Sequence, residues 1–142
     1  MFNPTRDEAR RFLFDAWRKF RDKSILTDLE ALAVDHILRH PEYHALLDDT
    51  DANIERDWLP EQGETNPFLH LMMHLSISEQ LSIDQPAGIR ARYQALAVKL
   101  GDEHAAMHET MDCLGEMIWT SQRNGTPPDG AAYLACMEKK AR

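Results

Sequence analysis

The sequence predicts an all-α protein, an irregular bundle of five or six helices that forms a single helical domain over residues 1–142. Apolar side chains recur at the three- and four-residue spacing of amphipathic helices, and no segment alternates convincingly as a strand does. Cap residues, prolines and glycines separate these segments. With 142 residues, of which 43% are hydrophobic, the chain is long enough to enclose a core.

Three helices are predicted before residue 48. The first begins at Asn3-Pro4, a cap residue followed by a proline at the first helical position. The second begins at Thr27, because Thr27-Asp28-Leu29-Glu30 has the form of a capping box. Pro41 interrupts this second helix directly after His40, and it is expected to open a short third helix.

Five further segments complete the prediction. Residues 48–65 are polar and acidic, and they form the longest predicted irregular stretch. Residues 66–83 are apolar around most of a helical circumference, which predicts a largely buried helix. Helices are also predicted at 89–100, at 102–123 and around 131–140. The two long helices, 66–83 and 102–123, are expected to form the centre of the bundle.

The charge balance argues against nucleic acid as a partner. The chain carries 16 basic and 24 acidic residues, a net charge of −8, and an acidic protein repels phosphate backbones. A basic stretch that includes Arg10 alternates with aromatic residues. We interpret it as the solvated face of an amphipathic helix rather than a binding patch.

The sequence predicts a cytoplasmic protein with no membrane partner. No apolar run approaches the roughly 20 residues that a membrane span needs, and the first ten residues lack the apolar core of a signal peptide. Cys113 and Cys136 are far apart in helical patterns, and we expect both to be reduced thiols.

Six of the seven histidines form three HxxxH pairs, His36/His40, His70/His74 and His104/His108. Side chains four residues apart on a helix lie about 40° apart around its axis, so each pair offers two imidazole nitrogens on one face. Paired imidazoles are typical ligands of a divalent metal ion. Core or surface histidines are the alternative interpretation.

Two of these pairs are the better metal candidates. Asp112 and Glu116 extend the stripe of His104 and His108 with two carboxylates, and His70/His74 lies on the other long helix. If the two helices pack side by side, these residues can share one ion. Mixed nitrogen and oxygen ligands suit Zn²⁺, Fe²⁺, Ni²⁺ or Mn²⁺.

The first pair is the weaker candidate. Because Pro41 ends the helix beside His40, we expect at least one residue of the pair to lie at the surface near a kinked helix end. His36 or His44 is an alternative residue that completes a site.

Four blocks of the chain carry a resemblance to a known family. They are MFNPTRDEARRFLFDAWRK, HPEYHALLDD, TNPFLHLMMHLSISEQLSIDQPAGIR and HETMDCLGEMIWTSQRNGTPPD. These blocks resemble a small bacterial family that is catalogued as a domain of unknown function. The resemblance implies a soluble bacterial protein of one compact domain, and it supplies neither an activity nor a functional residue.

Two hypotheses for function follow from these patterns. In the first, a soluble helical protein binds a divalent metal through His70, His74, His104 and His108, with Asp112 as a ligand and Glu116 close by. In the alternative, the protein is a non-enzymatic interaction module, a homodimer or scaffold that buries its apolar helix 67–83 with Trp58 and Trp119. The sequence leaves open whether the protein is an enzyme, and it identifies no substrate and no other cofactor.

Overall fold

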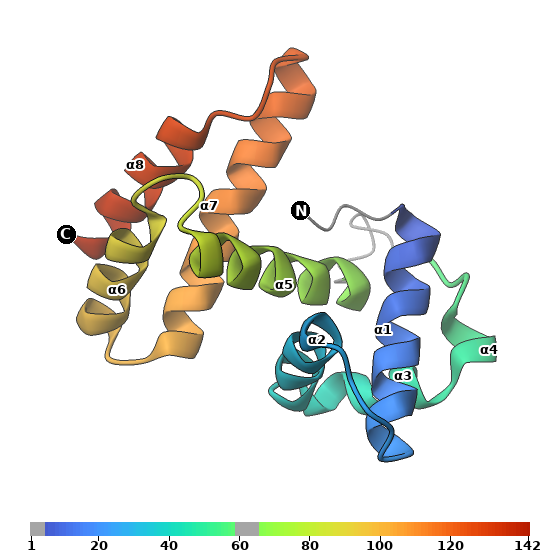
Figure 1. Ribbon diagram of the computed structural model, residues 1–142. Coiled ribbons are helices and arrows are strands. Elements are labelled where there is room, and N and C mark those ends of the chain that lie inside the picture. Colours follow the sequence, from blue (N-terminus) through green and yellow to red (C-terminus); the bar gives the residue numbers. More distant parts are fainter. Residues whose placement is uncertain (1–4, 59–65) are drawn as a thin grey trace. The chain divides into compact units, whose positions relative to one another are not determined.

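The computed structural model describes residues 5–58 and 66–142, and within them it contains helices and no strand (Figure 1). The elements are α1 (Arg6–Arg21), α2 (Asp28–Leu38), the 3-10 helix η1 (Pro41–Tyr43), α3 (His44–Asp48), α4 (Thr50–Asn53), α5 (Pro67–Ile83), α6 (Ile89–Leu100), α7 (Glu103–Asn124) and α8 (Gly130–Ala141). The predicted all-α class is therefore confirmed.

The predicted count of five or six helices is too low, because eight α-helices lie in the described residues. Six of them have 11 residues or more and match the predicted segments. The short helix predicted to open at Pro41 is present as η1 followed by α3. Helix α4 was missed, because its four residues are too few to show a helical period. The stretch 48–65 accordingly begins with a helix at Thr50, and its residues 59–65 lie outside the described residues.

The chain divides into two compact units, Met1–Leu75 and Ser76–Arg142. Helix α5 begins in the first unit and ends in the second. A single domain over residues 1–142 stays a prediction. None of the described helices is long and apolar enough to cross a membrane.

Threonine capping boxes begin α1 and α2 in the first unit. At α1 the hydroxyl of Thr5 accepts from the backbone N–H of Glu8, whose carboxylate accepts from the N–H of Thr5, both at 3.2 Å. Thr27 and Glu30 form the same box at α2, as predicted. The start predicted at Asn3-Pro4 lies outside the described residues, and the described helix begins at Arg6.

Glu30 ties the start of α2 to α1. Its nearly buried carboxylate accepts from the backbone N–H of Thr27 and from Lys19 Nζ, each at 2.9 Å. The backbone hydrogen bond from Thr27, followed by the contact with Lys19, lowers the pKa of Glu30 from its ordinary value of 4.5. The ionised form is therefore the one that stabilises the fold.

Replacing Glu30 with glutamine is expected to flatten the acid side of the stability profile. A carboxyl whose pKa is lowered by folding contributes stability above its unfolded pKa, and this contribution is lost as the pH falls through the folded pKa. Between about pH 5 and pH 3, the free energy of unfolding should fall more steeply in the wild type than in Glu30→Gln. Urea titrations followed by circular dichroism measure both slopes. The control is Asp35→Asn, an exposed carboxylate in the same helix, and equal slopes for all three proteins would contradict this role of Glu30.

A hydrophobic core holds α1, α2, α3 and the start of α5 together in the first unit. Its buried members are Leu13, Phe14, Ala16, Trp17, Ala33, Val34, Ile37, Leu47, Phe68 and Leu71. Trp17 also donates from its indole Nε1 to Asp48 Oδ1 at 2.7 Å, which fixes α1 against the end of α3. This packing sets the segment after α2 against the first turns of α5.

Arg10 corrects the interpretation of a fully solvated basic face. Its side chain is buried, with the guanidinium 4.6 Å from the ring centre of Phe68 and 5.4 Å from that of Trp58. The same group donates to the backbone carbonyls of Ile54 and Arg56 at 3.0 and 2.8 Å. A buried guanidinium is tolerated here because aromatic faces and carbonyls surround it.

The second unit packs α6, α7 and α8 against one another (Figure 1). Its buried side chains include Ile89, Leu96, Met107, Leu114, Tyr133 and Met137. The Tyr133 hydroxyl donates to Gln80 Oε1 of α5 at 2.7 Å, and burial raises the pKa of this phenol. Gly101 and Gly125, both with positive φ, end α6 and α7 as left-handed caps.

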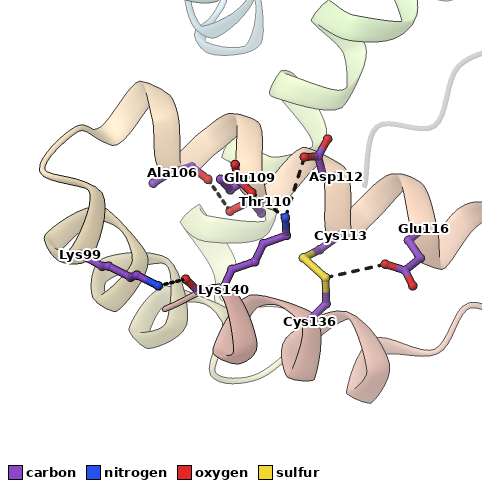
Figure 2. Close-up of polar contacts among 9 residues, drawn as sticks. All are labelled: Lys99, Ala106, Glu109, Thr110, Asp112, Cys113, Glu116, Cys136 and Lys140. Atoms are coloured by element: carbon purple, nitrogen blue, oxygen red, sulfur yellow. Dashed lines mark hydrogen bonds and ion pairs between the residues drawn. A yellow bond between two sulfur atoms is a disulfide. The ribbon is translucent and has the colours of Figure 1, made fainter. Parts of the chain in front are cut away.

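Cys113 of α7 and Cys136 of α8 form a disulfide, so the expectation of reduced thiols is wrong in this structure (Figure 2). The two Cα atoms lie 5.8 Å apart, within the range that a disulfide bridges. The sequence did not reveal the pairing, because the cysteines are 23 residues apart and meet only when α8 folds back on α7.

Candidate metal centre

Three histidines of the first unit bring their ring nitrogens together. His40 lies between α2 and η1, and His70 and His74 lie one turn apart on α5. The Nε2 atom of His70 is 3.0 Å from Nε2 of His40 and 3.2 Å from Nε2 of His74. One ligand nitrogen from each ring lies within 4.8 Å of the other two. We call these residues the histidine cluster.

The break after α2 turns the His40 ring inward. Helix α2 ends at Leu38, and His40 takes a non-helical backbone conformation with φ −126° and ψ 67° before Pro41. Its Nδ1 atom is 2.7 Å from the backbone carbonyl oxygen of His36. A carbonyl only accepts, so Nδ1 carries the proton, and in the neutral ring Nε2 presents a lone pair to His70.

His70 and His74 owe their positions to the helical period of α5. Their ring centroids are 4.8 Å apart with planes inclined by 71°, so the two rings meet edge to face. Asn66 begins this helix, and its Oδ1 accepts from the N–H groups of Phe68 and Leu69 at 3.0 and 3.2 Å. Phe68 and Leu71 then anchor the same turns in the core.

Two further rings enclose the cluster. His36 stacks on His74 at a centroid distance of 4.8 Å, and Tyr43 stacks on His40 at 5.4 Å. His36, His40 and His74 are buried, and His70 is half-buried. Burial, followed by the charge of Glu42, raises the pKa of Tyr43, so its phenol stays neutral near pH 7.

The spacing of the cluster nitrogens is close to that of ligands on one ion. Zinc binds imidazole nitrogen at about 2.0–2.1 Å, which places two tetrahedral ligands about 3.3 Å apart. The two Nε2 separations of 3.0 and 3.2 Å are slightly shorter than this. The arrangement is thus able to offer three imidazole ligands from two chain segments.

The burial of the first pair contradicts the expectation that His36 or His40 lies at the surface. Both side chains are less than 10% exposed. Pro41 does end the helix, but the resulting turn directs the His40 ring toward α5 instead of solvent. Sequence reasoning missed His40 as a ligand candidate, although the HxxxH spacing had singled it out. His44, the other suggested addition, contacts the carbonyl oxygen of Ile37 at 2.9 Å and the ring of Trp17.

The predicted ligands on α7 lie in the second unit. The rings of His104 and His108 are 4.2 Å apart, as their spacing on one helix predicts. Asp112 is exposed, with Oδ2 3.9 Å from Lys140 Nζ, and Glu116 Oε2 lies 3.9 Å from Cys136 Sγ (Figure 2). Among the described residues, the group able to hold a metal contains neither carboxylate. Convergence of this pair with His70/His74 stays a prediction.

Comparison with known proteins gives one match. The model of the family described as a domain of unknown function, DUF1841, matches residues 5–139. No curated protein and no solved structure matches the chain significantly.

Proposed function

Since the chain belongs to the DUF1841 family, whose description gives no activity, we propose from the site alone that this protein binds a divalent transition-metal ion. His40, His70 and His74 are the proposed ligands, each through Nε2. The observation that carries the proposal is the meeting of these three nitrogens, with separations of 3.0 and 3.2 Å.

The electrostatics of the cluster support a cation at its centre. The carbonyl of His36 keeps the His40 proton on Nδ1, so the His40 lone pair faces the other two rings. A proton on His70 Nε2 can donate to only one of its two nitrogen neighbours, Nε2 of His40 and Nε2 of His74. A divalent ion accepts all three lone pairs at once, and the contact of His40 with the His36 carbonyl then serves as the outer contact that orients a ligand.

An all-imidazole set narrows the choice of metal. Imidazole suits zinc, iron and nickel, whereas manganese prefers carboxylate, carbonyl and water oxygens. With Asp112 and Glu116 left out of the ligand set, Mn²⁺ is the least suitable of the four ions that the sequence suggested. We propose Zn²⁺ as the first ion to test.

Three protein ligands leave a coordination position for water or substrate. An ion held in this way supplies a Lewis acid and a bound water of lowered pKa. In this site the three histidines of the cluster bind the ion, and burial limits the access of bulk water. His36 covers the ring of His74, and Tyr43 covers the ring of His40. The proposal is one of metal binding, and it assigns no reaction.

Titration with Co²⁺ tests the proposal in solution. Tag-free protein is stripped with a chelator and titrated while visible ligand-field absorption is recorded. We expect bands that saturate at one equivalent and disappear when Zn²⁺ is added, because both ions use nitrogen ligands. A His40→Ala/His70→Ala/His74→Ala variant should give the spectrum of aqueous Co²⁺.

Two further variants serve as a control and as a test of whether α7 adds a ligand. His44→Gln keeps a donor for the Ile37 carbonyl and should retain the wild-type spectrum. His108→Ala tests the sequence-based prediction that α7 adds a ligand, and a shifted spectrum supports that addition. Identical spectra for wild type and the triple variant, in proteins with equal helical content, would overturn the proposed site.

A further inference from the structure

The two residues of the disulfide differ in exposure. Cys113 lies on the inner side of α7 and is 1% exposed, whereas Cys136 of α8 is half-buried. In thiol–disulfide exchange the attacking thiolate reaches one sulfur and expels the other, so access decides which is attacked. Of the two residues Cys136 is the more exposed, so we expect attack at its sulfur.

A cavity gives this sulfur a place for a small reagent. Its volume is about 240 Å³, and its lining includes Cys113, Cys136, Glu116, Asp129 and Tyr133. A second hollow is lined by Cys136, Glu116, Lys139 and Lys140, among others. Cys136 therefore lines two openings.

Helix α8 has anchors that do not depend on the disulfide. Tyr133 and Met137 are fully buried, and the Tyr133 hydroxyl is bonded to Gln80. Lys140 Nζ lies 2.5 Å from Glu109 Oε2 of α7 (Figure 2), and Glu138 Oε1 lies 2.9 Å from the guanidinium of Arg92 on α6. These contacts keep α8 in place when the sulfurs separate, which makes reversible opening compatible with the fold.

We propose that Cys113–Cys136 is a thiol-exchange site whose reagent is a small-molecule thiol that enters the cavity. The thiol, having lost its proton to solvent, forms a bond to Cys136 Sγ while the S–S bond breaks, and Cys113 leaves as a thiolate that takes a proton from solvent. A second thiolate attacks the sulfur of the first reagent in the mixed disulfide and expels Cys136. The protein disulfide is reduced by two electrons, and two thiols are oxidised to one small-molecule disulfide.

The charge around the cavity selects among such thiols. Glu116 Oε2 lies 3.9 Å from Cys136 Sγ, and Asp129, whose side chain accepts from the N–H of Ala132, is a second carboxylate in the lining. Like charges at such distances repel even in water. The lining of this cavity contains both carboxylates and none of the described basic residues, so entry through it favours neutral or cationic thiols over thiols that carry a carboxylate.

Reduction kinetics with matched thiols test this proposal on the full-length oxidised protein. Cysteamine, 2-mercaptoethanol and 3-mercaptopropionate are compared at low ionic strength. For each thiol, the rate of protein reduction per thiolate is divided by the rate at which the same thiolate reduces 2-hydroxyethyl disulfide. We expect cysteamine to exceed 3-mercaptopropionate by about fivefold, and Glu116→Gln to reduce this ratio to within about twofold of unity. Asp112→Asn, another carboxylate of α7, should leave the ratio unchanged.

Three observations accompany the expected rates. The rate rises linearly with thiol concentration, peptide mapping of acid-quenched samples finds the mixed disulfide on Cys136, and the reduced protein keeps its helical circular dichroism. A rate that is independent of thiol concentration, a mixed disulfide on Cys113, or two free thiols in air-oxidised protein would overturn the proposal. An equal or reversed preference among the three thiols would do so as well.

Discussion

Replacing His40 with alanine is expected to weaken Zn²⁺ binding by more than about 100-fold, because loss of a ligand exceeds the 10–100-fold cost of losing an outer contact. His40 supplies one of the three nitrogens, and its carbonyl partner holds the ring in the tautomer that binds. The side chain is removed from the end of a helix, so the core of the first unit keeps its members.

Competition against a chromophoric chelator measures this affinity. His44→Gln is the matched control, since it lies on the same segment four residues later, and it should stay within about threefold of wild type, the usual scatter of single contributions. Equal affinities for His40→Ala and His44→Gln would remove His40 from the ligand set.

Replacing Trp17 with alanine is expected to destabilise the protein by about 3–5 kcal/mol, the usual cost of deleting a large aromatic side chain from a core. The indole is 2% exposed and donates to Asp48 at 2.7 Å. It also packs on the ring of His44, 4.6 Å away, whose Nε2 contacts the carbonyl of Ile37.

Urea denaturation followed by circular dichroism measures the loss of stability. The control is Trp119→Ala, because Trp119 is 57% exposed and a surface substitution should change the free energy of unfolding by no more than about 0.5 kcal/mol. Comparable losses for the two variants would contradict the assignment of Trp17 to the core.

Local rules predicted most of the helices. The capping box at Thr27, the cap at Asn66 and the glycine after α7 each gave a boundary within a residue or two of the structure. These signals act within one turn of chain, so the sequence contains all the information they need. Pro41 also predicted the short helix that the structure contains as η1 and α3, whereas α4 was not predicted because a single turn shows no period.

The site was only partly predictable for the same reason. The spacing of His70 and His74 placed both rings on one face of α5, and the structure agrees. The approach of His40 depends on how the segment after α2 packs against α5, which is tertiary information. Pro41 was interpreted as a sign of exposure, whereas the turn that it introduces directs His40 inward.

The contacts of the α7 carboxylates and of the two cysteines could not be predicted from the sequence. Asp112 and Glu116 lie on α7 as predicted, but the contacts described for them are with Lys140 and Cys136 of α8. The helical period predicts on which face of a helix a side chain lies, but it does not predict which residue of another helix that side chain contacts. The same limit concealed the disulfide, whose two helices become neighbours only in the folded second unit.

Metal content tests most directly whether His40, His70 and His74 bind an ion. Tag-free wild type and the His40→Ala/His70→Ala/His74→Ala variant are incubated with Zn²⁺, dialysed together and analysed for metal and protein. We expect about one equivalent of zinc in the wild type and less than about a tenth in the variant, since three imidazoles hold the ion. Less than a tenth of an equivalent in the wild type, or equal content in two folded proteins, would contradict it.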